Sequence, residues 1–257
     1  MLKIADITYS VEGRPLFEGA SATIPDGHKV GLVGRNGAGK TTLFRLIRGE
    51  LALEGGTISL PTRARIGGVA QEVPSSSTSL IDTVLAADTE RAALMAEAET
   101  AHDPMRIADI QHRLADIDAW SAEARASSIL KGLGFDAAAQ LRPCSDYSGG
   151  WRMRVALAGV LFAQPDVLLL DEPTNDLDVE TLQALEAAID DFAGCAVIIS
   201  HDRFFLDRLC THILAFEGDA HVEWFEGNFE AYEEDKIRRL GPDSVEPKRV
   251  KYKKFSR

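Results

Sequence analysis

The chain has 257 residues, of which 45 % are hydrophobic and 26 % are charged, and its formal net charge is −12. This length and composition are typical of a soluble globular protein with a sizeable buried core, as one large domain or two lobes. No apolar run of the sequence approaches the roughly 18–20 residues that cross a bilayer, so a transport role would need a separate membrane protein.

The first third of the chain predicts a β-rich lobe around one helix. Strands are expected where apolar residues alternate or run together between turns that contain glycine or proline. The expected strands cover residues 3–9, 16–24, 28–33, 57–60 and 65–70.

A phosphate-binding pattern follows the third of these strands. Gly34–Thr41 has the sequence Gly-Arg-Asn-Gly-Ala-Gly-Lys-Thr, which fits G-x-x-x-x-G-K-[ST], and a helix is predicted over residues 41–48. In such a loop the backbone N–H groups and the helix N-terminus surround a phosphate chain. Lys40 is expected to bridge the β- and γ-phosphates, and the Thr41 hydroxyl to bind Mg²⁺. The residues expected to contact the nucleotide here are Gly34, Asn36, Gly37, Ala38, Gly39, Lys40, Thr41 and Thr42.

An alanine-, glutamate- and arginine-rich segment follows the strands. Gln71 ends the last strand, where its side chain can reach Mg²⁺ or an attacking water. Residues 80–145 then predict a helical lobe inserted in the α/β core, with helices over 89–99 and 106–130 and a break at His102-Asp103-Pro104.

Two further polar groups lie where anions and metals bind. Ser148, Gly149 and Gly150 precede a predicted helix and form a second anion-binding N-terminus. The apolar strand over residues 167–170 ends in Asp171 and Glu172. Asp171 is expected to hold Mg²⁺ through water, and Glu172 to polarise the attacking water.

His201 follows a second buried strand over residues 195–199. At the same sheet edge it can contact a γ-phosphate and hold either the water or Glu172. A single histidine in such a place is by itself more typical of a satisfied core residue.

The ordered set of these motifs resembles the ATP-binding cassette (ABC) superfamily over nearly the whole chain. The resemblance implies an α/β P-loop NTPase fold over residues 1–240, with an N-terminal β subdomain, a RecA-like core and the inserted helical subdomain. It assigns Gln71 to the glutamine loop, where it acts in catalysis and on Mg²⁺, and His201 to the switch histidine. Residues 148–150 take the place of the signature, and 176–178 that of the loop that joins two cassettes.

Within the superfamily the chain resembles the ABC-F branch, whose members act on ribosomes in the cytoplasm and have no membrane domains. The residues that carry this likeness are 148–158, 171–178, 200–207 and 225–234, with Trp151 where transporter cassettes usually have glutamine or glutamate. The three cysteines have no C-x-x-C spacing, which is typical of reduced cytosolic thiols.

The chain departs from the ABC-F pattern in three ways. It has one cassette where these proteins normally have two, and residues 1–170 resemble a first cassette whereas 171–257 resemble the end of a second. This leaves open a complete product, a fragment or a chimera. The aromatic residue that stacks on adenine aligns with Val11, and Tyr9, two residues earlier on the same strand face, takes its place as the candidate.

A single cassette implies a composite site, because ATP is held between the phosphate loop of one cassette and the signature of another. Hydrolysis would then need a homodimer or a second cassette, closed by ATP. Residues 236–257 carry nine Lys or Arg against two Asp or Glu, so the basic tail over 241–257 is expected either to contact rRNA phosphates or to be solvated. Three functions stay open: an ABC-F-type ATPase on ribosomes, the ATPase subunit of a transporter, and a binding module that does not hydrolyse ATP.

Overall fold

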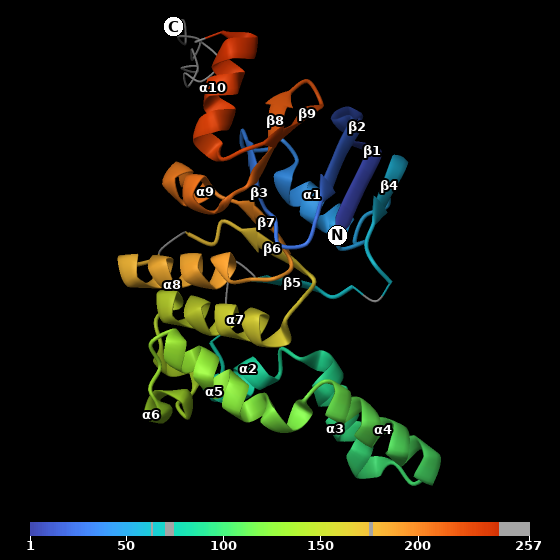
Figure 1. Ribbon diagram of the computed structural model, residues 1–257, viewed down its shortest axis with the longest axis vertical. Helices are drawn as coiled ribbons and strands as arrows, with labels where there is room; N and C mark the ends of the chain where they lie inside the picture. Colours follow the sequence, from blue (N-terminus) through green and yellow to red (C-terminus); the bar gives the residue numbers. More distant parts are fainter. Residues whose placement is uncertain (63, 70–74, 175–176, 242–257) are drawn as a thin grey trace, which may run out of the picture.

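A six-stranded sheet crosses the middle of the molecule in the computed structural model, which describes residues 1–62, 64–69, 75–174 and 177–241 (Figure 1). Its strands are parallel except β9, which pairs antiparallel with β8. In spatial order they are β5 (Ile66–Val69), β6 (Val167–Asp171), β7 (Cys195–Ile199), β3 (Lys29–Gly34), β8 (His212–Gly218) and β9 (His221–Glu226). The apolar sequences of β6 and β7 suit strands that are covered on both faces.

A smaller antiparallel sheet covers one face of the central sheet. Its apolar side chains and those of helix α1 (Lys40–Ile47) form one buried cluster with that face, the N-terminal cluster. Its strands, in spatial order, are β2 (Arg14–Ile24), β1 (Leu2–Val11) and β4 (Gly55–Ser59). Side chains of a strand alternate between its two faces, and Leu169 and Val197 point into this cluster. The end of the phosphate loop lies against this small sheet, because a Cβ on Gly39 would be 3.2 Å from the Phe17 ring and 3.3 Å from the Leu16 side chain of β2.

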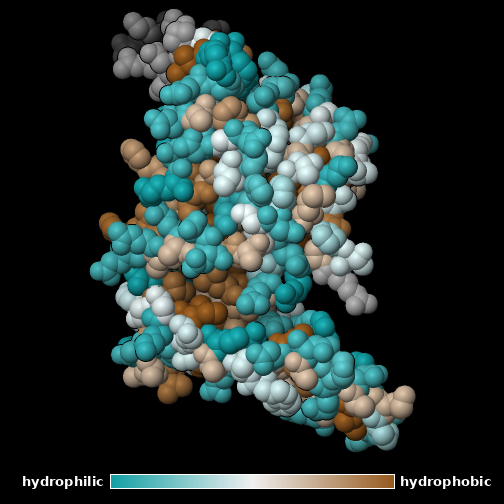
Figure 2. Space-filling model, in the orientation of Figure 1, coloured by the Kyte–Doolittle hydropathy of each residue, from teal (hydrophilic) through white to brown (hydrophobic). Residues whose placement is uncertain are grey.

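Helices cover the opposite face of the central sheet. Leu168, Leu170 and Ile198, the alternate residues of β6 and β7, belong to this second buried cluster. The helices that contribute to it include α7 (Gly149–Ala163), α8 (Val179–Asp190) and α9 (Arg203–Leu209). Apolar side chains gather over α7 in the view of Figure 2. Helices α1 and α7 therefore lie on opposite faces of the sheet.

The inserted segment is helical, as the sequence predicted, but its helices differ from the expectation. Its elements are α2 (Leu80–Leu85), α3 (Thr89–Thr100), α4 (Pro104–Asp116), a 3₁₀ turn at Ala119–Ser121, α5 (Ala122–Gly132), α6 (Ala137–Gln140) and a 3₁₀ turn at Cys144–Asp146. The single helix predicted over 106–130 is wrong, because the chain turns after Asp116. Asp118 has a φ of 50°, a left-handed conformation that Asp tolerates. Its backbone carbonyl accepts a hydrogen bond from the Ser121 hydroxyl.

Helices α3 and α4 form a hairpin that projects from the body (Figure 1). Ile110, Leu114 and Ala119 form a small buried cluster of their own, and Arg113 and Arg106 make ion pairs with Glu90 and Glu97 across the hairpin. The hairpin thus has its own packing, separate from the two main clusters.

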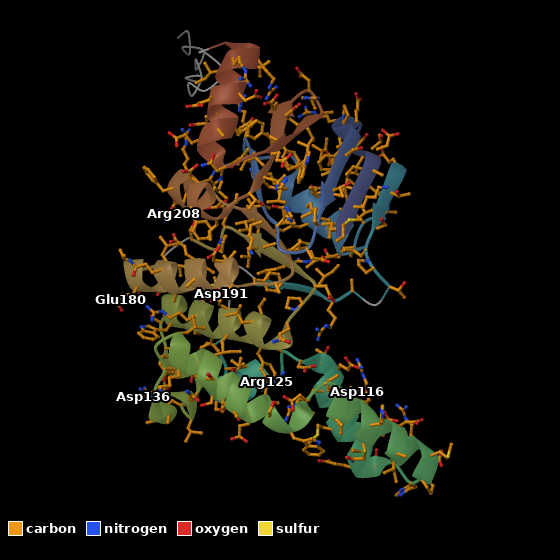
Figure 3. All side chains as sticks on the ribbon, in the orientation of Figure 1. Asp116, Arg125, Asp136, Glu180, Asp191 and Arg208 are labelled. Carbon is orange, nitrogen blue, oxygen red and sulfur yellow. The ribbon has the colours of Figure 1, made fainter. Side chains whose placement is uncertain are left out.

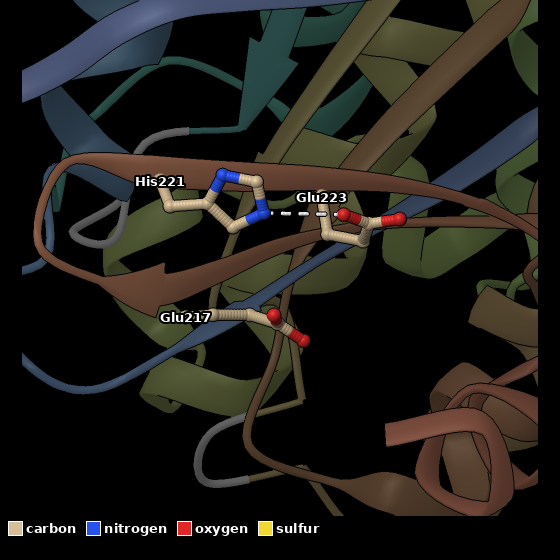
Figure 4. A group of neighbouring side chains, drawn as sticks. All are labelled: Glu217, His221 and Glu223. Carbon is tan, nitrogen blue, oxygen red and sulfur yellow. Dashed lines mark hydrogen bonds and ion pairs between the residues drawn. The ribbon is translucent and has the colours of Figure 1, made fainter. Parts of the chain in front are cut away.

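Helix α10 (Phe229–Leu240) ends the described chain and is anchored to the β8–β9 hairpin through Glu217. The Glu217 carboxylate accepts hydrogen bonds of 2.9 Å from the Tyr232 hydroxyl and of 2.9 and 3.1 Å from Arg239. His221 and Glu223 lie beside it, so that one potential metal-ligand atom of each residue falls within 4.8 Å of the others (Figure 4). Arg239 and Tyr232, both on α10, already donate hydrogen bonds to the Glu217 carboxylate. These bonds hold α10 against the β8–β9 hairpin.

Candidate nucleotide site

The predicted phosphate-binding loop lies between the end of β3 and the start of α1. The strand ends at Gly34 and the helix begins at Lys40. Asn36 and Gly37 are exposed on the loop, whereas Ala38 is half-buried and packs against the N-terminal cluster. Gly39, at the N-cap, and Thr42 stay predicted contacts of a nucleotide. The strand–loop–helix context expected from the sequence is present.

Lys40 is held inside this loop. Its Nζ donates hydrogen bonds to the backbone carbonyls of Gly34 at 2.9 Å and Arg35 at 3.2 Å, and the residue is 8 % exposed. Burial lowers the pKa of Lys40 below its ordinary value of 10.5, while the nearby carboxylates of Glu172 and Asp171 raise it. The loop therefore contains a buried ammonium group, and an anion in the loop would compensate its charge.

Thr41 and Asp171 meet across 130 residues of sequence. The Thr41 hydroxyl donates a hydrogen bond of 3.3 Å to Asp171 Oδ2 at the end of β6. A hydroxyl and a carboxylate beside a phosphate loop are the oxygen ligands that Mg²⁺ prefers. These two residues fit the metal that the sequence predicted here, together with the phosphates of a nucleotide.

Glu172 and His201 form the second pair of the site. Asp171 pairs with Ile199 in the β6–β7 register. Glu172, one residue after Asp171, and His201, two residues after Ile199, therefore lie at the same edge of the sheet. His201 Nε2 lies 3.2 Å from Glu172 Oε1, and the His201 backbone N–H donates to Oε2 at 3.2 Å. Glu172 has a φ of 49°, and its N–H donates to the Ile199 carbonyl. The carboxylate is thereby fixed from two sides, with only 12 % of its side chain exposed.

The sequence of residues 17–175 matches the ABC transporter family. This match covers more than half of the chain and includes the phosphate loop and both carboxylates. The chain belongs to the ABC family of ATPases. Members of this family bind and hydrolyse ATP. The family match also confirms the predicted cassette fold.

Curated relatives of this cassette include two proteins of Escherichia coli K12. The energy-dependent translational throttle protein EttA is 40 % identical over 257 residues, which are 100 % of this chain and 42 % of EttA. The probable ATP-binding protein YheS is 42 % identical over 230 residues, which are 88 % of this chain and 36 % of YheS. The cassette thus spans less than half the length of these relatives, and both matches agree with the predicted ABC-F likeness.

A solved structure shows the same fold. CbiO1 from Clostridium perfringens, described as part of the ABC transporter complex cbiONQ, has a TM-score of 0.66 and 24 % sequence identity. The alignment covers 95 % of this cassette and 96 % of that chain. Of the helices in the described part of the cassette, none combines the length and the apolar character needed to cross a membrane.

The predicted signature residues lie at the N-terminus of α7. Ser148 is the N-cap of α7, its backbone is extended, and its side chain makes no capping hydrogen bond. Ser148 and Gly149 are exposed and Gly150 is half-buried. Helices α7 and α1 pack against opposite faces of the sheet, and the role of the signature residues stays a prediction.

Gln71 and Asp176 lie outside the described residues, so their predicted roles stay predictions. Tyr9 is half-buried and packs against the N-terminal cluster, whereas Val11, at the tip of the β1–β2 hairpin, is 42 % exposed. Tyr9 is thus part of the core packing, and its stacking on adenine also stays a prediction.

The sequence did not indicate two polar residues that support the site. Ser200, which is buried directly before His201, has its hydroxyl 3.0 Å from that of Thr174, and it accepts a hydrogen bond from the Asp202 N–H. Ser200 thereby connects the segment after Glu172 with the segment that carries His201. A serine beside a histidine has no pattern of its own, and only the fold indicates this contact.

Proposed function

We propose that this cassette binds Mg-ATP at the loop between β3 and α1 and hydrolyses it. Lys40 would leave the carbonyls of Gly34 and Arg35 and contact the β- and γ-phosphates. Thr41 and Asp171 would hold Mg²⁺, which supplies charge neutralisation of the phosphates. Glu172 would polarise the attacking water, held in position by its two contacts with His201.

The position of the signature carries the rest of the proposal. Lys40 begins α1 and Ser148 caps α7, and these helices pack against opposite faces of the central sheet, which supports the proposal that the two residues contact different nucleotides. A two-fold arrangement of two cassettes would bring the exposed Ser148 of each to the nucleotide of the other. Hydrolysis would then follow ATP-dependent closure, either as a homodimer or with a second cassette.

We further propose that the ribosome is the target of the closed form. The name of the relative EttA refers to translation, and the ABC-F-like residues 200–207 and 225–234 lie in the same half of the chain as the basic tail. A net positive tail on an acidic body suits contact with rRNA phosphates while the body itself stays off nucleic acid.

Light scattering on Glu172→Gln with and without Mg-ATP tests the closure. Loss of the carboxylate should slow turnover by roughly 10²–10⁴-fold and trap the closed form. The expected result is a mass that doubles with Mg-ATP in Glu172→Gln. Glu99→Gln, an exposed carboxylate on α3, serves as the matched control and should hydrolyse ATP at the wild-type rate.

Each outcome decides between the candidate functions. ATP-dependent doubling, followed by co-sedimentation of Glu172→Gln with ribosomes that falls with salt, supports the ABC-F-type function. Doubling without ribosome binding would contradict the proposed target and favour a transporter subunit. A monomer at saturating ATP would contradict a self-sufficient ATPase and favour a binding module.

A further inference from the structure

Two of the stretches that carry the ABC-F likeness meet in the structure. Residues 200–207 contain His201 and most of α9, whereas residues 225–234 end β9 and begin α10. Helices α9 and α10 lie next to each other, and both contribute side chains to the buried cluster that contains α7 (Figure 1). The contact between them begins two residues after His201, at Arg203.

Arg203, the first residue of α9, makes two contacts with α10. Its Nη1 donates a hydrogen bond of 2.8 Å to Glu233 Oε1. Its guanidinium carbon lies over the Phe229 ring, 5.6 Å from the centroid. Phe229 and Glu233 are four residues apart and therefore lie on one face of α10. A planar guanidinium that stacks on a ring and pairs with a carboxylate is restricted in its orientation by both contacts.

Further contacts attach α10 at its start and along its length. The Asp207 carboxylate on α9 accepts a hydrogen bond of 2.9 Å from the Glu230 N–H in the first turn of α10. Tyr232 and Arg239 hold α10 against β8 through the Glu217 carboxylate. Helix α10 is thus anchored to the central sheet, and Arg203 joins the start of α9 to this anchored helix.

His201 depends on the backbone for its position. Its Nε2 lies 3.2 Å from Glu172 Oε1, yet 61 % of the side chain is exposed, so neighbouring side chains restrain the imidazole only in part. The backbone N–H of His201 donates to the same carboxylate. Asp202 then caps α9 by accepting from the Phe205 N–H at 3.1 Å. A displacement of the start of α9 would therefore carry His201 away from Glu172.

We propose that Arg203 is a positioning residue for ATP hydrolysis, which holds His201 beside Glu172 by joining the start of α9 to α10. The inference rests on the proposed hydrolysis at this site. Arg203 acts through the backbone of residues 201–203, and not by contact with the nucleotide. Because its side chain is 61 % exposed, the ion pair with Glu233 contributes little to folding stability, and its loss affects the geometry of the site more than the fold.

Two variants that change the charge in opposite directions test this role. Arg203→Met and Glu233→Met each remove the ion pair and keep an unbranched side chain. An electrostatic effect on His201 would have opposite signs in the two variants, whereas a loss of position has the same sign in both. Arg208→Met is the matched control, because Arg208 also lies on α9 (Figure 3) but pairs with Glu186 on α8.

The first measurement is ATP turnover, in the wild-type and the His201→Ala backgrounds. In the wild-type background we expect kcat to fall roughly tenfold in Arg203→Met and in Glu233→Met, with KM within about twofold, because displacement of a catalytic group slows the reaction more than it weakens binding. Arg208→Met should keep the wild-type rate. In the His201→Ala background Arg203→Met should have no further effect, because the residue through which it acts is absent.

The second measurement does not depend on hydrolysis. Carbon-13 NMR of the histidine rings in the nucleotide-free protein, with the His201 resonance assigned by its loss in His201→Ala, reports the surroundings of this imidazole. In Arg203→Met and in Glu233→Met the His201 resonance should move in the same direction, toward that of an unrestrained histidine. In Arg208→Met it should stay in place.

The inference is overturned if the His201 resonance stays in place in Arg203→Met, or if it moves in opposite directions in the two variants. It is also overturned if Arg203→Met lowers turnover equally with and without His201, because Arg203 would then support the fold alone. If the wild-type protein does not hydrolyse ATP, the proposed hydrolysis fails, and the resonance still decides whether Arg203 positions His201. If Arg203→Met does not fold, Glu233→Met decides by the same two measurements.

Discussion

Alanine substitutions at Gly34 and Gly37 separate two demands that the phosphate loop places on glycine. Both residues have a positive φ, 152° at Gly34 and 77° at Gly37. A Cβ on Gly34 would lie 2.7 Å from Phe216 Cβ and 2.9 Å from the Phe216 carbonyl oxygen, whereas a Cβ on Gly37 meets nothing within 4 Å. Gly34 therefore needs both the conformation and the space, and Gly37 needs only the conformation.

The expected magnitudes follow from these contacts. Gly37→Ala carries only the backbone strain, which destabilises the protein by about 1 kcal/mol. Gly34→Ala carries similar strain and must also displace the β8 backbone at Phe216, which adds about 2 kcal/mol. For a domain of this size the difference corresponds to a melting temperature roughly 4–8 °C lower for Gly34→Ala than for Gly37→Ala.

Thermal unfolding of the nucleotide-free proteins, followed by circular dichroism, measures this difference. Fluorescent-ATP binding is the second assay, and Gly37→Ala is expected to lose affinity despite its small effect on melting, because Gly37 lies on the exposed loop. Equal melting temperatures of the two variants, or a lower one for Gly37→Ala, would refute the argument from the Phe216 backbone.

Two further predictions concern buried charge. Because burial lowers the pKa of Lys40, its ammonium group destabilises the nucleotide-free fold at neutral pH, and this effect disappears as pH rises toward 10.5. Lys40→Met should therefore melt at or above the wild-type temperature and lose the stabilisation that Mg-ATP gives, which differential scanning fluorimetry with and without Mg-ATP would show. At Glu217, burial raises the pKa, but hydrogen bonds from Arg239 and Tyr232 outweigh burial and hold it below the ordinary 4.5. The stability from Glu217 is thus present above pH 4.5 and is lost as pH falls through the native pKa, so the melting temperatures of Glu217→Gln and wild type should differ at pH 7 and converge in acid. A difference that persists in acid would contradict this.

Much of the candidate site could be predicted from the sequence because its signals are local. The glycines, Lys40 and Thr41 are contiguous, and the apolar run before them and the helix after them are readable from neighbouring residues. Asp171, Glu172 and His201 each follow a buried strand, and the carboxyl ends of parallel strands meet at one edge of a sheet. That rule placed Glu172 beside His201, 29 residues away, as the structure confirms.

The tertiary structure alone decided the rest. Local periodicity suggested one helix over 106–130, but packing of Ile110 and Leu114 in a separate hairpin ends it at Asp116. No sequence pattern indicated which face of the sheet α1 and α7 each cover, or that Ser200 meets Thr174. Such contacts depend on which face of each element is buried against which partner, and residues far apart in the chain carry no local record of that choice.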